Sequence, residues 1–296
     1  MRRQTILLCW IVLLSWGPAD AAALTVVDDA GRSIILNGPP KRIMTLTPSS
    51  TEILFALGAG DRIVAVDRWS DYPPTAQEKP RVIPFSSNLE QIVRASPDVI
   101  LSTYGGAEPL LPLERHGIKV MIFAPRTLDD IYRNILLMGR MVDAEARAED
   151  LVRAMRQRVA AVVAKVRNAP MPKVFIELDG SDPGRPFTAG PDSFIDGLIR
   201  LAGGVNVAVR AHAMWPQFSL EELIRTDPDL ILLGEAGASS GSRVPGLVAG
   251  RSGWANLRAV RRGAIVSIDL DLISRPGPRI VEGLELLARL LHPDRF

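Results

Sequence analysis

The longest regular pattern of apolar and polar positions in the chain lies between Asp143 and Val166. Apolar residues recur there every third or fourth position, and charged residues fill the positions between them. This spacing places the apolar side chains on one face of a helix. Asp143 is a candidate N-cap, and Asn168 with the prolines at 170 and 172 is expected to end the helix. The pattern therefore predicts one amphipathic helix, roughly 35 Å long at about 1.5 Å per residue.

The segments on either side of this helix resemble each other. Residues 88–101 read N-L-E-Q-I-V-R-A-S-P-D-V-I-L, and residues 219–232 read S-L-E-E-L-I-R-T-D-P-D-L-I-L. Each copy predicts a capped short helix with an acidic first turn, then a proline turn and a buried strand. The chain thus contains an internal repeat, and we expect two similar lobes joined by one helix.

The remaining apolar runs alternate between short strands and helices. We expect a hairpin over 24–35, with strands at 42–46, 63–66, 119–123, 173–178 and 264–268. Helices are expected at 52–57, 128–141, 193–201 and 279–291, and a loop at 269–278. This alternation predicts an α/β fold of two Rossmann-like lobes with mainly parallel sheets. The predicted divisions are an N-terminal lobe over 24–142, a linking helix over 143–168 and a C-terminal lobe over 169–296.

The N-terminus has the pattern of a secretory signal peptide. Arg2 and Arg3 precede an apolar run that ends at Trp16, and small residues follow it at the expected cleavage positions. The run is too short to span a bilayer. We therefore expect residues 1–23 to be removed and the mature chain to act in the periplasm. Cys9 is the only cysteine and lies in this segment, so the mature chain needs no disulfide.

Composition limits the size of the domains and argues against one class of ligand. The 296 residues are 47% hydrophobic and 23% charged, which suits one large or two modest globular domains. The formal net charge of +2 and the lack of a basic stripe give no reason to expect nucleic-acid binding.

Enzymatic motifs are missing from the sequence. It contains no Walker loop, no G-x-S-x-G, no H-E-x-x-H and no G-x-G-x-x-G behind a strand, and its three histidines are isolated. We therefore expect neither catalytic residues nor a metal site. The pairs Asp179/Asp182 and Asp269/Asp271 leave a secreted two-lobed hydrolase as an alternative, although loop aspartates more often form caps and turns.

Aromatic residues are only 5% of the chain, yet several fall in predicted loops that follow strands or precede a repeat copy. Ligands of open α/β sheets bind outside the carboxyl ends of the strands. Large flat side chains there suit a large, flat, mostly apolar ligand. The six candidate ligand-binding aromatics are Trp69, Tyr72, Phe85, Tyr104, Phe187 and Trp215.

Several short motifs resemble those of class III periplasmic substrate-binding proteins, and within that class the cobalamin-binding components of bacterial ABC importers. The resemblance covers nearly the whole mature chain. S-D-Y-P-P and W-P-Q are fairly specific to the corrinoid branch, whereas P-D-V-I-L is shared across the class. The motifs are R-I-M-T-L-T-P-S-S-T-E at Arg42, S-D-Y-P-P at Ser70, N-L-E at Asn88, F-T-A-G at Phe187, W-P-Q-F-S at Trp215 and S-R-P-G-P-R at Ser274.

The resemblance implies a helical-backbone fold of two rigid lobes that hold the ligand between them. Trp69, Phe85 and Trp215 fall at or near positions where the family has aromatics against the corrin ring. Asp271 and Arg275 fall in the loop that contacts the polar edge of the ligand.

The chain also departs from the family pattern. Phe85 replaces a tryptophan, with one residue fewer before N-L-E, and Thr103-Tyr104 replaces another. These changes leave an incomplete corrinoid, haem or a siderophore as alternative ligands. Haem would take Tyr72 or Tyr104 as its iron ligand. Siderophore carboxylates would take arginines such as those at 68, 185 and 275.

Glu90 and Glu221 occupy equivalent places in the two repeat copies. A glutamate in the first turn ordinarily stabilises its helix through the helix dipole. The resemblance implies a second role, because in the family one glutamate on each lobe docks onto arginines of the two permease subunits. Matching charges on both lobes fit such a two-fold partner.

Together these features predict a monomeric, non-enzymatic carrier. It would capture a corrinoid, either cobalamin or a precursor, and deliver it to an ABC permease dimer with its ATPase subunits. Because a corrinoid brings its own axial ligands, the carrier needs no cofactor or metal of its own. A partner-sensing or scaffold protein that binds no small chromophore is a further alternative.

Overall fold

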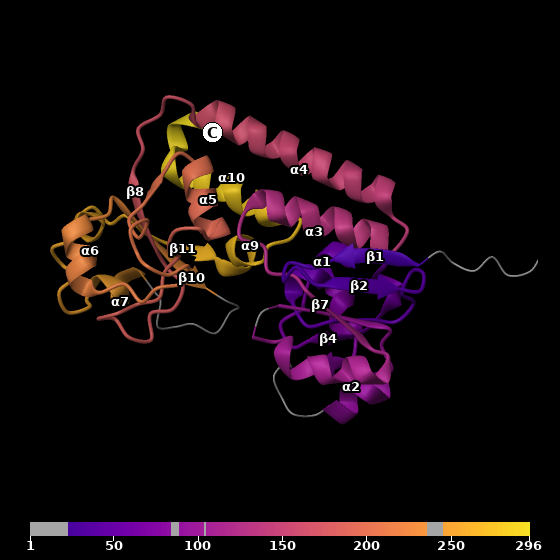
Figure 1. Ribbon diagram of the computed structural model, residues 1–296. Coiled ribbons are helices and arrows are strands. Elements are labelled where there is room, and N and C mark those ends of the chain that lie inside the picture. Colours follow the sequence, from indigo (N-terminus) through magenta and orange to yellow (C-terminus); the bar gives the residue numbers. More distant parts are fainter. Residues whose placement is uncertain (1–22, 84–88, 104, 236–244) are drawn as a thin grey trace, which may run out of the picture.

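The computed structural model describes residues 23–83, 89–103, 105–235 and 245–296. Two α/β lobes lie side by side, and one long helix, α4, extends along both (Figure 1). Residues 1–22 of the predicted signal peptide lie outside these ranges, as do Phe85 and Tyr104. No helix within the described ranges has both the length and the apolar character that crossing a membrane requires.

The N-terminal lobe contains a parallel sheet in the order β5-β4-β3-β6-β7. Its strands are β3 (Ile43–Thr45), β4 (Ile63–Asp67), β5 (Arg81–Val82), β6 (Val99–Ser102) and β7 (Lys119–Ile122). The central strands β3 and β6 are buried along their whole length, which is why their sequences are mostly apolar and do not alternate with polar residues. The predicted hairpin is β1 (Leu24–Val27) with β2 (Ser33–Leu36). The helices are α1 (Pro48–Ala56), α2 (Leu89–Ala95), α3 (Leu128–Met141) and 3₁₀ turns that include Glu108–His116.

The C-terminal lobe contains a parallel sheet in the order β11-β10-β8-β9. These strands are β8 (Lys173–Glu177), β9 (Val205–Asn206), β10 (Leu230–Glu235) and β11 (Ile265–Asp269). The main helices are α5 (Phe194–Leu201), α6 (Leu220–Thr226) and α10 (Ile280–Leu291), with short helices α7 (Pro245–Ala249) and α8 (Arg258–Arg261).

The prediction of a loop over residues 269–278 is wrong in its first half. Residues Leu270–Ser274 form the short helix α9. The carboxylate of Asp269 accepts a hydrogen bond from the backbone N–H of Asp271 at 2.9 Å and so caps the first turn. Ile273 is fully buried, so tertiary packing holds a helix too short to be stable alone.

The linking helix is α4 (Glu145–Val166), which packs on α3 of the first lobe and on α10 of the second. Asp143 is not its N-cap, because Ala144 occupies that position and makes no side-chain cap. Asp143 instead has a left-handed backbone (φ +56°), which lets the chain turn from α3 into α4. One continuous apolar core includes buried residues of both sheets and of α4, so the packed helix joins the two lobes.

The repeat in the sequence is also a repeat in the fold. The strand order β4-β3-β6-β7 of the first lobe matches β9-β8-β10-β11 of the second. Asp98 of the first P-D-x-I-L motif accepts a hydrogen bond from the N–H of Arg42, at 2.9 Å, just before β3. Asp229 of the second copy accepts one from the N–H of Lys173, at 3.0 Å, at the start of β8. The repeated aspartate therefore fastens equivalent strands in both lobes.

Candidate functional site

A cleft of about 810 Å³ lies between the lobes, at the carboxyl ends of their strands. Its first wall comes from the segments that follow β3, β4, β6 and β7, and its second wall includes the segments that follow β8 and β11. The lining is mostly apolar. Position and lining are those expected of a ligand site in an open parallel α/β sheet.

Two tryptophans line this cleft from opposite lobes. Trp69 follows β4 in the N-terminal lobe, and Trp215 lies in the segment between β9 and α6 of the C-terminal lobe. The side chains are 46% and 42% exposed, respectively, which is high for such large apolar residues. A flat ligand in the cleft would cover indole surface on both sides.

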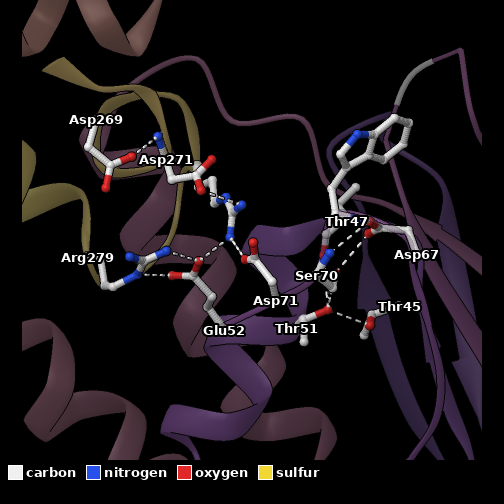
Figure 2. Close-up of polar contacts among 12 residues, drawn as sticks. Thr45, Thr47, Thr51, Glu52, Asp67, Ser70, Asp71, Asp269, Asp271 and Arg279 are labelled. Atoms are coloured by element: carbon white, nitrogen blue, oxygen red, sulfur yellow. Dashed lines mark hydrogen bonds and ion pairs between the residues drawn. The ribbon is translucent and has the colours of Figure 1, made fainter. Parts of the chain in front are cut away.

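Trp69 is held in place by a buried carboxylate. One oxygen of Asp67 accepts hydrogen bonds from the backbone N–H groups of Trp69, at 2.6 Å, and Ser70, at 3.0 Å, and its other oxygen accepts from the Ser70 hydroxyl at 2.9 Å. The chain of hydroxyls continues from Ser70 to Thr51 at 2.8 Å and to Thr45 at 2.6 Å (Figure 2). The loop that bears Trp69 is therefore anchored to both β3 and α1.

Two charged side chains of this loop, Asp67 and Arg68, contact Trp69. Burial raises the pKa of Asp67 above its usual range, although the hydrogen bonds from Ser70 and Trp69 and the charge of Arg275 act in the opposite direction. The guanidinium of Arg68 lies 4.3 Å from the centre of the Trp69 ring in a cation–π contact. A ligand that stacks on Trp69 would use the opposite face of the indole or displace Arg68.

Trp215 is held by a close pairing of two chain segments. The N–H of Gly190 donates to the carbonyl of Met214 at 2.8 Å, and the N–H of Thr188 donates to the carbonyl of Pro216 at 3.0 Å. These bonds flank Trp215 on both sides in the chain. The motifs F-T-A-G and W-P-Q thus lie side by side, and the first positions the second.

A cluster of charged residues crosses from one lobe to the other beside the cleft. Arg275 of the C-terminal lobe lies 2.6 Å from Asp71 and 3.3 Å from Glu52, both of the N-terminal lobe, and 2.7 Å from Asp271 of its own lobe. Arg279 holds the same Glu52 in a two-pronged contact at 2.6 and 2.9 Å (Figure 2). Glu52 and Arg275 are both buried, so water screens this cluster little.

Burial and the neighbouring charges shift the pKa values of Asp271, Asp71 and Arg275. Burial raises the pKa of Asp271, and the charge of Arg275 only partly offsets it. Burial also acts to raise the pKa of Asp71, but the hydrogen bond and charge of Arg275 outweigh it and hold that pKa below its usual range. Burial acts to lower the pKa of Arg275, but its carboxylate partners raise it overall. The cleft therefore has a permanent cation with carboxylate oxygens beside it.

Two of the other candidate aromatics have described positions, and neither lines this cleft. Tyr72 lies under the guanidinium of Arg279, at 3.9 Å from the ring centre, and lines a separate pocket of about 430 Å³ beside α4. Phe187 lines a pocket of about 1070 Å³ in the C-terminal lobe, which shares Trp215 with the cleft. Phe85 and Tyr104 lie outside the described residues.

The cleft contains two phenylalanines that the sequence analysis did not single out. Phe123 directly follows β7, and Phe194 begins α5 and packs edge-on against Trp215 with ring centres 5.8 Å apart. The sequence analysis placed them only within a predicted strand (119–123) and a predicted helix (193–201), and both are mostly buried. Their position after a strand or at the start of a helix was the available signal.

The remaining candidates have other surroundings. Glu90 and Glu221 are exposed on α2 and α6. Asp179 and Asp182 accept hydrogen bonds from N–H groups two residues further along, as in ordinary turns, and neither lines the cleft. Within the described ranges, no three His, Cys, Asp or Glu residues gather in a way that would hold a metal ion.

Comparison with known proteins places this geometry in a family. Residues 43–272 match the family model described as periplasmic binding protein. The chain is 31% identical over 278 residues to a cobalamin-binding protein of Halobacterium salinarum, covering 91% of this chain and 74% of that protein.

Solved structures of two further proteins have the same fold. The periplasmic vitamin B12 binding protein BtuF of Vibrio cholerae superimposes with a TM-score of 0.73 at 27% identity, covering 86% of this chain and 98% of that one. The periplasmic heme-binding protein RhuT of Roseiflexus sp. RS-1, in its apo form, gives 0.76 at 25% identity, covering 86% and 99%. The similar proteins share a two-lobed fold and differ in what they bind.

Proposed function

Because this chain belongs to the periplasmic binding protein family, whose members bind a transported substrate and are not enzymes, we propose that it is the corrinoid-binding component of an ABC importer. It takes up cobalamin or a precursor in the cleft between its lobes and delivers it to a membrane permease with its ATPase subunits. Recognition of the permease uses Glu90 and Glu221, the exposed glutamates of the two repeat copies.

One observation carries the choice of ligand: Trp69 and Trp215 face a shared cleft from opposite lobes. Indole rings on both walls suit a broad, flat, largely apolar ring system. Stacking adds about 1 kcal/mol per ring beyond the burial of apolar area. The resemblance in S-D-Y-P-P and W-P-Q and the identity to a cobalamin-binding protein support the same choice.

The charged edge of the cleft suits the rim of a corrin ring. A corrin carries amide side chains, each with a donor and an acceptor group. Asp271 and Arg275 lie at the cleft and offer carboxylate oxygens and guanidinium N–H groups. Arg275 and Arg279 face three carboxylates, those of Glu52, Asp71 and Asp271, so the cluster has a slight excess of negative charge and favours neutral polar groups over a free anion.

Haem is the alternative within the same family. Haem iron in proteins is usually held by an axial His, Tyr, Cys or Met side chain. The described residues that line the cleft include no histidine, tyrosine or cysteine, and their one sulfur-bearing side chain is Met214. Tyr72 faces a different pocket, and Tyr104 lies outside the described residues. A corrinoid needs no such ligand from the protein, and this favours the corrinoid over haem.

Absorbance titration of the purified protein with cobalamin, cobinamide, haemin and a ferric hydroxamate tests the proposal. We expect saturable binding of a corrinoid. Trp69→Ala and Trp215→Ala should each weaken it about tenfold, because each removes one stacking surface. Phe296→Ala is the matched control, since Phe296 is 38% exposed and does not line the cleft. Saturable binding of haemin or the hydroxamate alone would contradict the proposal, as would tryptophan variants with unchanged affinity.

A further inference from the structure

The two repeat helices each present one apolar side chain to solvent at the same place. Val93 on α2 is 48% exposed, and Ile224 on α6 is 47% exposed. The two residues are equivalent in the alignment of N-L-E-Q-I-V-R with S-L-E-E-L-I-R. Single exposed apolar residues are common on protein surfaces. Here, however, a β-branched apolar side chain is exposed to the same extent at the equivalent position of both copies.

Neither residue is needed to pack its helix. Ile92 and Leu223, the preceding residues, are the buried contacts that fix α2 and α6 to their sheets, with exposures of 3% and 0%. Val93 and Ile224 lie outside these buried contacts, so a polar residue at either position should cost the monomer little stability.

Each apolar residue lies beside a carboxylate. Glu90 precedes Val93 by three positions and Glu221 precedes Ile224 by three, so the two side chains of each pair are neighbours on the helix surface. Both glutamates are exposed, and neither forms an ion pair with any described residue. On α6 the nearby Arg225 is instead bonded to Glu222, at 2.6 Å.

The two helices are placed where a partner can reach both. α2 lies at the end of the N-terminal lobe away from α4, and α6 lies at the outer side of the C-terminal lobe (Figure 1). A partner that covers the open side of the two lobes, opposite the linking helix, would meet both helices.

We propose that Val93 and Ile224, each beside its glutamate, are the apolar anchors of a docking surface for two like subunits of a membrane permease. Each subunit would present a basic side chain next to an apolar hollow. The inference rests on the proposed function and adds two apolar residues whose burial in the interface contributes to the affinity. Charges at the rim of an interface chiefly govern association rate and orientation, whereas apolar side chains that become buried in it add binding energy. Equivalent anchors on two lobes match a two-fold partner.

The test measures binding of the fluorescently labelled protein to spheroplasts of the native host that lack their own copy. The docking variant is Val93→Gln with Ile224→Gln, which keeps the charge and does not lower helix propensity. The control variant makes the same change at two other exposed apolar positions, one on each lobe: Val27, at 55% exposure, and Leu247, at 62%. Cobalamin affinity of each purified variant is measured in parallel.

We expect the wild type and the control to bind saturably, and the docking variant to bind at least about tenfold more weakly with unchanged cobalamin affinity. Each single substitution should cause a similar, smaller loss. Unchanged binding of the docking variant would overturn the inference, as would an equal loss in the control or no saturable binding by the wild type. Specific spheroplast binding by a protein without cobalamin affinity would support the docking surface and refute the proposed ligand.

Discussion

Arg275 and Asp71 join the two lobes through a contact of 2.6 Å between a guanidinium nitrogen and a carboxylate oxygen. They lie 204 positions apart in the chain. With Glu52 and Arg279 they form a charged cluster next to the cleft, while α4 and the apolar core join the lobes elsewhere. Two separate attachments make a large hinge motion costly, so we expect the cleft to keep its width when a ligand binds.

Acid should weaken the contact between Asp71 and Arg275. Arg275 holds the pKa of Asp71 below its usual range, so this pair contributes stability above about pH 4 and loses it as the pH falls through the folded-state pKa. The Asp71 side chain is 51% exposed, so the contribution is at most about 1 kcal/mol.

We expect Asp71→Asn to flatten the loss of stability between about pH 5 and pH 3, measured by urea unfolding at each pH. Asp61→Asn, at an exposed position, is the control and should retain the wild-type slope. Identical pH profiles for Asp71→Asn and wild type would show that the ion pair adds nothing to stability.

Removal of Glu52 should be much more costly. Glu52→Ala leaves Arg279 without its bidentate partner and Arg275 without one of three carboxylates, both in a largely buried setting. Unpaired buried charges cost about 3–5 kcal/mol. We expect a loss of that size in the free energy of unfolding, against less than about 0.5 kcal/mol for the exposed Glu282→Ala on α10. A loss below about 1 kcal/mol would mean that the arginines find other partners or water.

Asp67 should act on ligand affinity through Trp69. Asp67→Ala removes the acceptor of three hydrogen bonds from Trp69 and Ser70, so the loop that positions the indole becomes loose. We expect corrinoid affinity to fall severalfold. In a Trp69→Ala background the same substitution should have little further effect, because the ring it positions is gone. Additive losses in this double-mutant cycle would refute the positioning role.

Gly190 should be sensitive to a single methyl group. A Cβ at this position would lie 2.1 Å from the carbonyl oxygen of Ala213, in the segment that bears Trp215. Gly190→Ala must therefore push that segment away, with a loss of about 1–3 kcal/mol in stability and weaker ligand binding. Gly197→Ala is the matched control. A Cβ there meets nothing within 4 Å, and alanine favours the helix, so stability should hold or rise by up to about 1 kcal/mol. Equal behaviour of the two variants would contradict the close-packing argument.

Local patterns in the sequence were sufficient for the architecture. Apolar spacing of three and four identified the long helix, and the repeated P-D-x-I-L motif identified two equivalent strands, because both patterns record which side chains of an element are buried. The errors were also local. Asp143 is a turn residue and not a cap, and the segment after β11 begins with a helix, because its buried Ile273 and the cap from Asp269 act together.

The sequence by itself determined two α/β lobes, the helix that links them, and which few residues have the chemistry to hold a flat ligand. Only the tertiary structure decided that Trp69 and Trp215 share a cleft whereas Tyr72 does not, and that Arg275 reaches carboxylates of the other lobe. The physical reason is that periodicity encodes which face of an element is buried. The direction of a loop side chain depends on how the helices and strands pack together. The same is true of its contacts with partners some 200 positions away.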